Sequence, residues 1–217
     1  MLNQYRILSM NVKGGEVVMI LSNLKKLQKL IFENNGLITT KLVEQKGIHR
    51  EYLRMLVERG ELFAIERGVY IASFAWEDEM FILQAKYGKG VFSMGTALFL
   101  HKLTDRTPLF FTMTFPSTYN LTNPKIDGIR CVSQISKFYN IGITTAKTPF
   151  GKEVKCYDKE KTICDCIKYR KEIDITIMTD AIKMYANSPD KNLIRLMEYA
   201  ENMGVGDDIR KYMEVLI

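Results

Sequence analysis

The chain has 217 residues, which is enough for one large domain or two small ones. Its 47% hydrophobic and 26% charged residues are typical of a globular protein with a buried core, and the lack of any run of about 18 apolar residues excludes a membrane-spanning helix. The 31 basic and 25 acidic residues give a net charge of +6, which suits a polyanionic partner and equally suits a solubilising surface. Four cysteines with no secretory signal ahead of them indicate reduced thiols, so we expect a cytoplasmic protein without a disulfide framework.

Residues 1–18 differ from the rest because they show no periodic pattern. They contain Lys13-Gly14-Gly15-Glu16 shortly before Met19, and a purine-rich codon string resembling a bacterial ribosome-binding site can encode these four residues. We therefore expect residues 1–18 to be a disordered leader or a mis-assigned translation start, with natural translation from Met19. The intact mass of the protein made from its native locus tests this, and a species that begins at Met1 contradicts it.

Residues 19–73 carry the pattern of a winged helix-turn-helix domain. An amphipathic helix is expected from Ser22 to about Asn34, with leucines on one face and lysines on the other. A short helix follows Thr39, whose side-chain oxygen can accept from the first free amides, and it ends at Gly47, which tolerates the left-handed backbone of a tight turn.

A third helix and a hairpin complete this pattern. The apolar residues of the helix fall on one side at helical spacing, and the helix ends at Gly60. Residues 62–65 and 69–71 then read as two strands joined by residues 66–68. Helix, glycine turn, helix and hairpin is the order of a winged helix-turn-helix, whose second helix lies in a DNA major groove.

Basic residues of this motif are the candidate DNA contacts. Arg50 and Arg54 are four residues apart, so they project from one helix face, and an arginine can pair bidentately with guanine. Phosphate, minor-groove or additional base contacts are expected from the remaining basic side chains, namely Lys41, Lys46, His49, Arg59 and Arg67. The alternative interpretation of Arg50 and Arg54 is a solvated helix face laced with Glu51 and Glu58.

Residues 74–217 predict a mixed α/β domain that ends in a helical tail. The expected helices and strands alternate up to about Asp158, and only helices are expected after it. The predicted strands are 91–93, 110–115, 129–133 and 154–157, and the predicted helices are 78–87, 95–102, 162–169, 175–186, 191–202 and 207–216. The fold class is therefore α+β, with a winged helix-turn-helix ahead of a mixed α/β domain.

Several motifs resemble those of a known family. They are Gly-Val-Tyr at Gly68–Tyr70, Gly-Thr-Ala-Leu-x-Leu-His at Gly95–His101, Glu-Lys-Thr-Ile-Cys-Asp at Glu160–Asp165 and the tail segment Lys191–Ala200. In this order they resemble the AbiEi antitoxins of the AbiE abortive-infection systems, which are type IV toxin–antitoxin systems. The resemblance extends from about Leu21 to the end of the chain. The residues at 93–95, Ser-Met-Gly, depart from the usual form of the second motif.

The resemblance implies a function for each domain. The winged helix would bind inverted repeats of double-stranded DNA in the promoter of its own operon and repress it. The second domain would supply the antitoxin effect against a nucleotidyltransferase-like toxin encoded alongside, without a stable complex between the two proteins. No enzymatic activity, cofactor, metal or membrane partner is implied.

Two other interpretations remain open from the residues. A winged helix can serve as a protein-interaction module without sequence-specific DNA binding. Asp127, Glu153 and Lys155 have the spacing of a magnesium-dependent nuclease, in which carboxylates hold the metal and lysine steadies the reacting phosphate. His101, in an apolar helix, is expected to be structural, and Cys164 and Cys166, two apart on a predicted helix, diverge too far to share a zinc ion.

Overall fold

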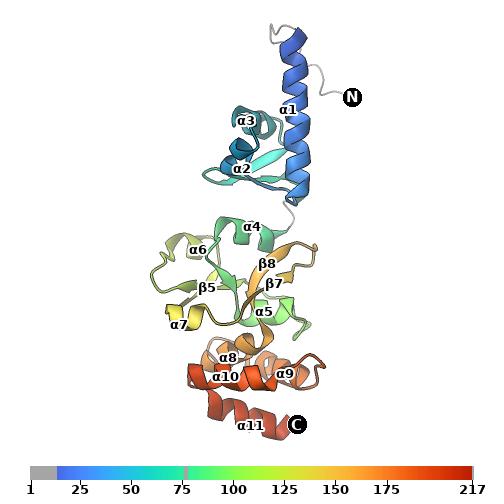
Figure 1. The fold of residues 1–217 in the computed structure, drawn as a ribbon. Helices are drawn as coiled ribbons and strands as arrows, with labels where there is room; N and C mark the ends of the chain where they lie inside the picture. The colour runs from blue at the N-terminus through green and yellow to red at the C-terminus, as the bar shows by residue number, and fades with distance from the viewer. Residues whose placement is uncertain (1–13, 76–77, 217) are drawn as a thin grey trace. The chain divides into compact units, whose positions relative to one another are not determined.

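The computed structural model describes residues 14–75 and 78–216 (Figure 1), and the chain divides into two compact units, residues 1–86 and 87–217. The sequence predicted this division after residue 73. Helix α4 (Glu79–Lys86) instead belongs to the first unit, because it packs against strands of that unit's sheet. Among the described residues, no helix is long and apolar enough to cross a bilayer.

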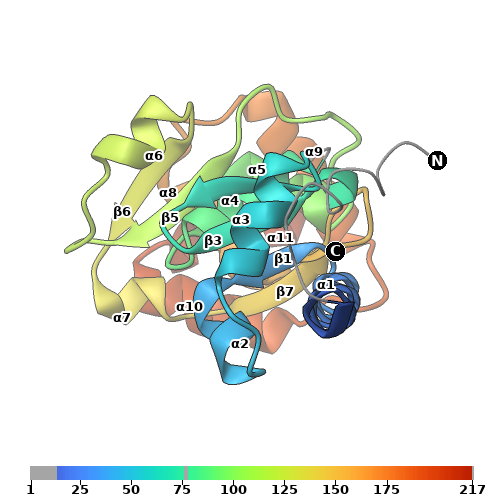
Figure 2. The same ribbon diagram turned by 90° about the horizontal axis from the view of Figure 1, so that it is seen from above.

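The first unit has the predicted winged-helix order. Its sheet is antiparallel with strand order β1-β3-β2. Ahead of α4, its elements are α1 (Gly14–Glu33), β1 (Leu37–Thr39), α2 (Thr40–Gln45), α3 (Glu51–Glu58), β2 (Leu62–Glu66), β3 (Val69–Ala72) and the 3-10 turn η1 (Ser73–Ala75). Figure 2, in which α1 is seen nearly end-on, shows α2 and α3 on the same side of α1. The arrangement confirms the predicted helix-turn-helix and hairpin.

Helix α1 begins earlier than predicted. It starts at Gly14 and not at Ser22, so residues 14–18 of the expected disordered leader are helical. No glycine or proline interrupts the chain between Glu16 and Ser22, and the helix therefore continues in the N-terminal direction. Residues 1–13 of the predicted leader lie outside the described residues.

The core of the first unit explains the apolar periodicity of its helices. Gly47, with φ of 69°, makes the predicted left-handed turn between α2 and α3. The turn brings the apolar sides of α1, α2 and α3 onto one face of the small sheet. The buried side chains there include Leu24, Leu27, Leu30, Ile31, Ile38, Val43, Ile48, Leu53, Leu56 and Leu62. Burial of these side chains fixes the outward face of α3.

The second unit combines a five-stranded mixed sheet with a helical layer (Figure 1). The strand order is β6-β5-β4-β8-β7, in which β4 pairs antiparallel with β5 and parallel with β8. Along the chain the elements are β4 (Val91–Phe92), α5 (Met94–Leu100), β5 (Thr112–Pro116), α6 (Thr122–Ile126), β6 (Arg130–Gln134), α7 (Ser136–Tyr139), β7 (Ile143–Lys147) and β8 (Glu153–Tyr157). Four helices follow, namely α8 (Lys159–Lys168), α9 (Ile175–Ala186), α10 (Leu193–Met203) and α11 (Gly206–Leu216). The four predicted strands and the helical tail are confirmed, and β7, α6 and α7 are additions.

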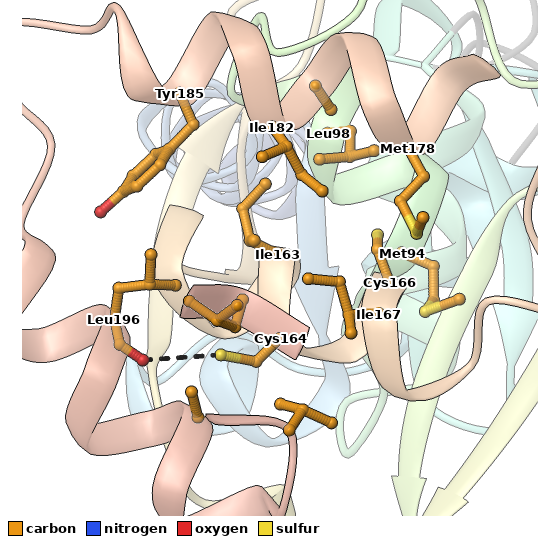
Figure 3. Close-up of a cluster of buried hydrophobic side chains, with 14 of the residues drawn as sticks. Met94, Leu98, Ile163, Cys164, Cys166, Ile167, Met178, Ile182, Tyr185 and Leu196 are labelled. Atoms are coloured by element: carbon orange, nitrogen blue, oxygen red, sulfur yellow. Dashed lines mark hydrogen bonds between the residues drawn. The ribbon is translucent and has the colours of Figure 1, made fainter. Parts of the chain in front are cut away.

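An apolar cluster joins the four C-terminal helices to α5 (Figure 3). Cys164 and Cys166 lie inside it, and the Cys164 thiol faces the main-chain oxygen of Leu196 at 3.8 Å. Burial is the largest influence that raises the pKa of Cys164 to about 12. The protonated thiol therefore packs as a small apolar group.

A buried polar network lies beside this cluster, on α8. The ammonium group of Lys161, which is fully buried, donates to both carboxylate oxygens of Asp165 at 2.7 Å. Gln134 of β6 links the two, since its amide donates to Asp165 at 2.9 Å and its oxygen accepts from Lys161 at 3.2 Å. The network therefore fastens α8 to the sheet through charge-assisted hydrogen bonds.

His101 has a structural position, as predicted. Its Nε2 lies 2.6 Å from the main-chain oxygen of Tyr157, and because that oxygen can only accept, Nε2 carries a proton and donates. Burial is the largest influence on this imidazole and lowers its pKa, against an opposing effect of the hydrogen bond to Tyr157. Burial thus favours the neutral form of His101 in the folded protein.

We expect a pH dependence of stability from this histidine. An unfolded histidine titrates near pH 6.5, so below that pH the unfolded chain binds a proton that the folded chain takes up less readily. The free energy of unfolding should therefore fall between about pH 7 and pH 5, and the His101→Gln variant, which keeps a donor, should lose less stability over this interval. Urea midpoints of both proteins at the two pH values measure the effect. An equal loss in both proteins contradicts it.

Candidate nucleic-acid interface

A hollow on the first unit brings together three of the predicted DNA contacts. It is lined by side chains of α3, the start of α2 and the turn between β2 and β3, namely Thr40, Arg50, Glu51, Arg54, Arg67, Gly68 and Tyr70. We call this surface the arginine face. Sequence spacing predicted that Arg50 and Arg54 share a face, and the fold adds Arg67 from the wing.

Helix α3 is oriented by its buried side. Leu53 and Leu56 are each 1% exposed, and Tyr52 is held to α1 by a hydrogen bond of 3.2 Å from the side-chain amide of Asn23. Because these anchors occupy one side of the helix, Arg50 and Arg54 are exposed on the other. The geometry leaves both guanidinium groups accessible to a groove of DNA.

The wing is short and tied to the helix-turn-helix. Gly68 has φ of 76°, and the backbone N–H of Thr40 donates to its carbonyl oxygen at 2.9 Å. A register shift between Ala64 and Glu66 bends the hairpin just before this turn. The contact fixes Arg67 beside the N-terminal end of α2. Thr40 and Tyr70 were not predicted as DNA contacts from the sequence. The signal for Thr40 is its place at a helix start, where hydroxyls often contact phosphates.

Arg54 also has acidic neighbours, which the alternative interpretation predicted. Its Nε donates to Glu58 at 3.0 Å, and its Nη1 lies 3.9 Å from Glu51. All three side chains are more than half exposed, so water screens these pairs, and each contributes about 0.5 kcal/mol or less. A bidentate contact with guanine is worth about 1–3 kcal/mol and can displace them.

Removing the Glu58 charge should strengthen DNA binding. The Glu58→Gln variant frees Arg54 and removes a negative charge from a surface that faces phosphates, so its affinity for operator DNA should rise about two- to fivefold. Fluorescence anisotropy titrations measure the change. The matched control is Glu33→Gln, which removes the acid of another exposed pair four residues apart, with Lys29 on α1. Equal effects of the two variants contradict a specific role for the arginine face.

The other predicted contacts lie outside the arginine face. Lys41 and Lys46 are exposed on and just after α2, and His49 precedes α3, where its Nδ1 accepts the backbone N–H of Glu51 at 3.3 Å. Arg59 follows the last turn of α3 and lies 4.0 Å from Glu61. The arginine face thus holds three of the seven predicted residues, and the other four are not among the residues that line it.

Two of the three residues of the nuclease alternative, Asp127 and Lys155, have structural partners. Glu153 and Lys155 lie on β8 as predicted, and Asp127 is the residue that ends α6. The Asp127 carboxylate accepts from the Tyr87 hydroxyl at 2.6 Å, and the Lys155 ammonium donates to the carbonyl oxygen of Gly88 at 2.6 Å. Within residues 14–75 and 78–216, no group of three histidine, cysteine, aspartate or glutamate side chains is arranged to hold a metal ion.

Comparison with known proteins bears on the first unit. Residues 26–72 match the family described as "Transcriptional regulator, AbiEi antitoxin", which confirms the predicted family resemblance over the segment that holds α2, α3 and the wing. No curated protein matches the chain. One solved structure that is similar is the crystal structure of RV2827C protein from Mycobacterium tuberculosis, with a TM-score of 0.49 and 9% sequence identity, covering 89% of this chain and 81% of that chain.

Proposed function

We propose that this chain is a cytoplasmic DNA-binding autorepressor and the antitoxin of a type IV toxin–antitoxin system, with a winged helix of the AbiEi kind as its DNA-binding part. The observation that carries the proposal is the convergence of Arg50, Arg54 and Arg67 on one exposed face of that winged helix. The match of residues 26–72 to a family of transcriptional regulators supports it. The chain acts by binding and not by catalysis.

Binding follows from the geometry of the arginine face. With α3 in the major groove, Arg50 and Arg54 reach the edges of bases, where a guanidinium pairs with the two acceptors of guanine. Arg67 and the Thr40 hydroxyl bind DNA phosphates. They lie on either side of the hydrogen bond between Thr40 and Gly68, and their phosphate contacts fix the position of α3 along the groove. Each phosphate contact releases a counterion, so affinity falls as salt rises.

Footprinting on the DNA upstream of its own operon tests the autorepressor function. We expect protection of two inverted half-sites, and we expect a reporter driven by this promoter to be repressed by the wild-type chain and not by the Arg50→Ala, Arg54→Ala double variant. A promoter that is repressed equally by both proteins contradicts the assignment of the arginine face.

Coexpression with the neighbouring nucleotidyltransferase-like toxin tests the antitoxin function. When both genes are driven by independent promoters, the wild-type chain should restore growth. The double variant should restore it as well, because relief of toxicity is assigned to residues 87–217. A tagged toxin should not retain the antitoxin during purification. Loss of rescue in the double variant contradicts the assignment of the antitoxin effect to residues 87–217. A stable complex with the toxin contradicts a type IV system.

A further inference from the structure

The second unit contains a cavity that the proposed function does not use. Its volume is about 480 Å³, and it lies between the start of α5, the segment 104–112, Arg130 of β6 and the residues around the start of α9. Its apolar lining includes Met94, Pro108, Ile173 and Ile177. Sites for small organic ligands are typically about 300–1,000 Å³ and mostly apolar, with a few polar groups. The cavity has the size and lining of such a site.

Two guanidinium groups border the cavity, and one of them is held rigidly. Arg130 stacks on the ring of Phe110, with its Cζ 3.6 Å from the ring centroid, and its Nη1 donates to the main-chain oxygen of Glu172 at 3.1 Å. The remaining N–H groups of Arg130 are preorganised for a further acceptor. Arg106 is the second cation in the lining.

Two acids share the rim. The carboxylate of Asp174 accepts the backbone N–H groups of Thr176 and Ile177, at 2.7 and 3.3 Å. These hydrogen bonds, assisted by the charge of Arg106, lower the pKa of Asp174, and its charge is therefore committed to capping α9. Glu172 also lines the cavity, so removal of its negative charge provides a control for an anionic ligand.

The start of α5, which lines the cavity, has two unusual backbone features. Gly95 lies in the first turn of α5 without a positive φ, and a Cβ built there meets no atom within 4 Å. Glycine destabilises a helix relative to alanine, so Gly95 leaves this space open at some loss of helix stability. The adjacent Met94 has φ of 51°, a strained value for a residue with a side chain. Both residues lie in the segment where the second sequence motif departs from its usual form.

We propose that this cavity binds a small apolar carboxylate of about the size of a two-ring aromatic acid. The apolar body would occupy the space above Gly95, and the carboxylate would accept from Arg130, with Arg106 adding positive charge. The Thr96 hydroxyl accepts the backbone N–H of Thr112 at 2.9 Å, and this hydrogen bond ties the first turn of α5 to the segment 104–112 on the other side of the cavity. This site is separate from the arginine face, and its occupancy does not depend on DNA binding.

Isothermal titration of the full chain with three matched probes tests the proposal. The probes are 2-naphthoate, 2-naphthylmethanol and 2-naphthylmethylammonium, which share a ring system and differ in charge. We expect 2-naphthoate to bind with a Kd below about 1 mM, the alcohol at least about tenfold more weakly and the ammonium compound most weakly. Absence of saturable 2-naphthoate binding at that concentration, or equal affinity for the ammonium compound, overturns the proposal.

Variants of the lining locate the binding. Gly95→Leu fills the cavity and should abolish binding of all three probes, whereas Gly95→Ala keeps most of the space and should retain it. Arg130→Gln should reduce the affinity for 2-naphthoate about tenfold or more and leave the affinity for 2-naphthylmethanol unchanged. Glu172→Gln should raise the affinity for 2-naphthoate. Far-UV circular dichroism checks the fold of each variant. Unchanged 2-naphthoate affinity in a folded Gly95→Leu or Arg130→Gln protein overturns the assignment.

Discussion

Replacing Arg50 and Arg54 together with alanine should weaken binding to operator DNA by about 30-fold or more. Each arginine that pairs with a guanine contributes about 1–3 kcal/mol of discrimination, so the double variant loses at least about 2 kcal/mol. Both side chains are exposed, and the ion pairs that Arg54 makes with Glu51 and Glu58 are weak. The stability of the first unit should therefore change little.

Anisotropy titrations against operator DNA and shuffled DNA measure this loss. The matched control is Lys25→Ala with Lys26→Ala, which removes the same two charges from the exposed side of α1. The control should weaken binding to both DNA molecules to a similar and small extent, as a change in net charge does. A control that loses as much operator affinity as the arginine variant contradicts base readout by α3.

The buried Lys161 should be the residue whose replacement most destabilises the second unit. The Lys161→Met variant leaves Asp165, which is 1% exposed, without its ammonium partner. Breaking a buried ion pair on one side costs about 3–5 kcal/mol, because the remaining charge is not compensated. The destabilisation should shrink as pH falls, because burial raises the pKa of Asp165 and Lys161 is the largest influence that opposes this rise.

Urea unfolding with hydrogen exchange of α8 measures this effect in the full chain. A second variant, Lys161→Met with Asp165→Leu, removes both charges and should recover most of the lost stability. If the double variant is as unstable as Lys161→Met, packing and not charge compensation explains the loss. Protection of α2 and α3 against exchange should stay unchanged in both variants, since they belong to the first unit.

The sequence predicted well those helices and strands whose own apolar pattern determines their type and their ends. Helix α9 was predicted at residues 175–186 and is observed at Ile175–Ala186, because its apolar face and the capping Asp174 mark it locally. Strand β7 was missed because all but one of its residues are exposed, and its extended conformation comes from pairing with β8. Strand β1 was missed for a similar reason, since three residues are too short to show a period.

The arginine face was only partly predictable from the sequence. Helical spacing places Arg50 and Arg54 together. Arg59, which we predicted as a phosphate or minor-groove contact beside the hairpin, is turned about 140° from Arg54 by the same spacing and is not among the residues that line the arginine face. Arg67 joins the face through the contact between Gly68 and Thr40. These two residues are 28 positions apart in the sequence, and sequence spacing does not predict that they touch in the fold. Tertiary contacts therefore decide the wing side of the site.

The central claim is that the winged helix reads the DNA upstream of its own operon. The most direct test is a titration of the full wild-type chain against that DNA and against a shuffled duplex of equal length, at two salt concentrations. We predict a preference of about 1,000-fold or more for the upstream DNA, with affinity for both duplexes falling as salt rises. Equal affinity for the two duplexes would contradict the account and leave a winged-helix module that binds other partners.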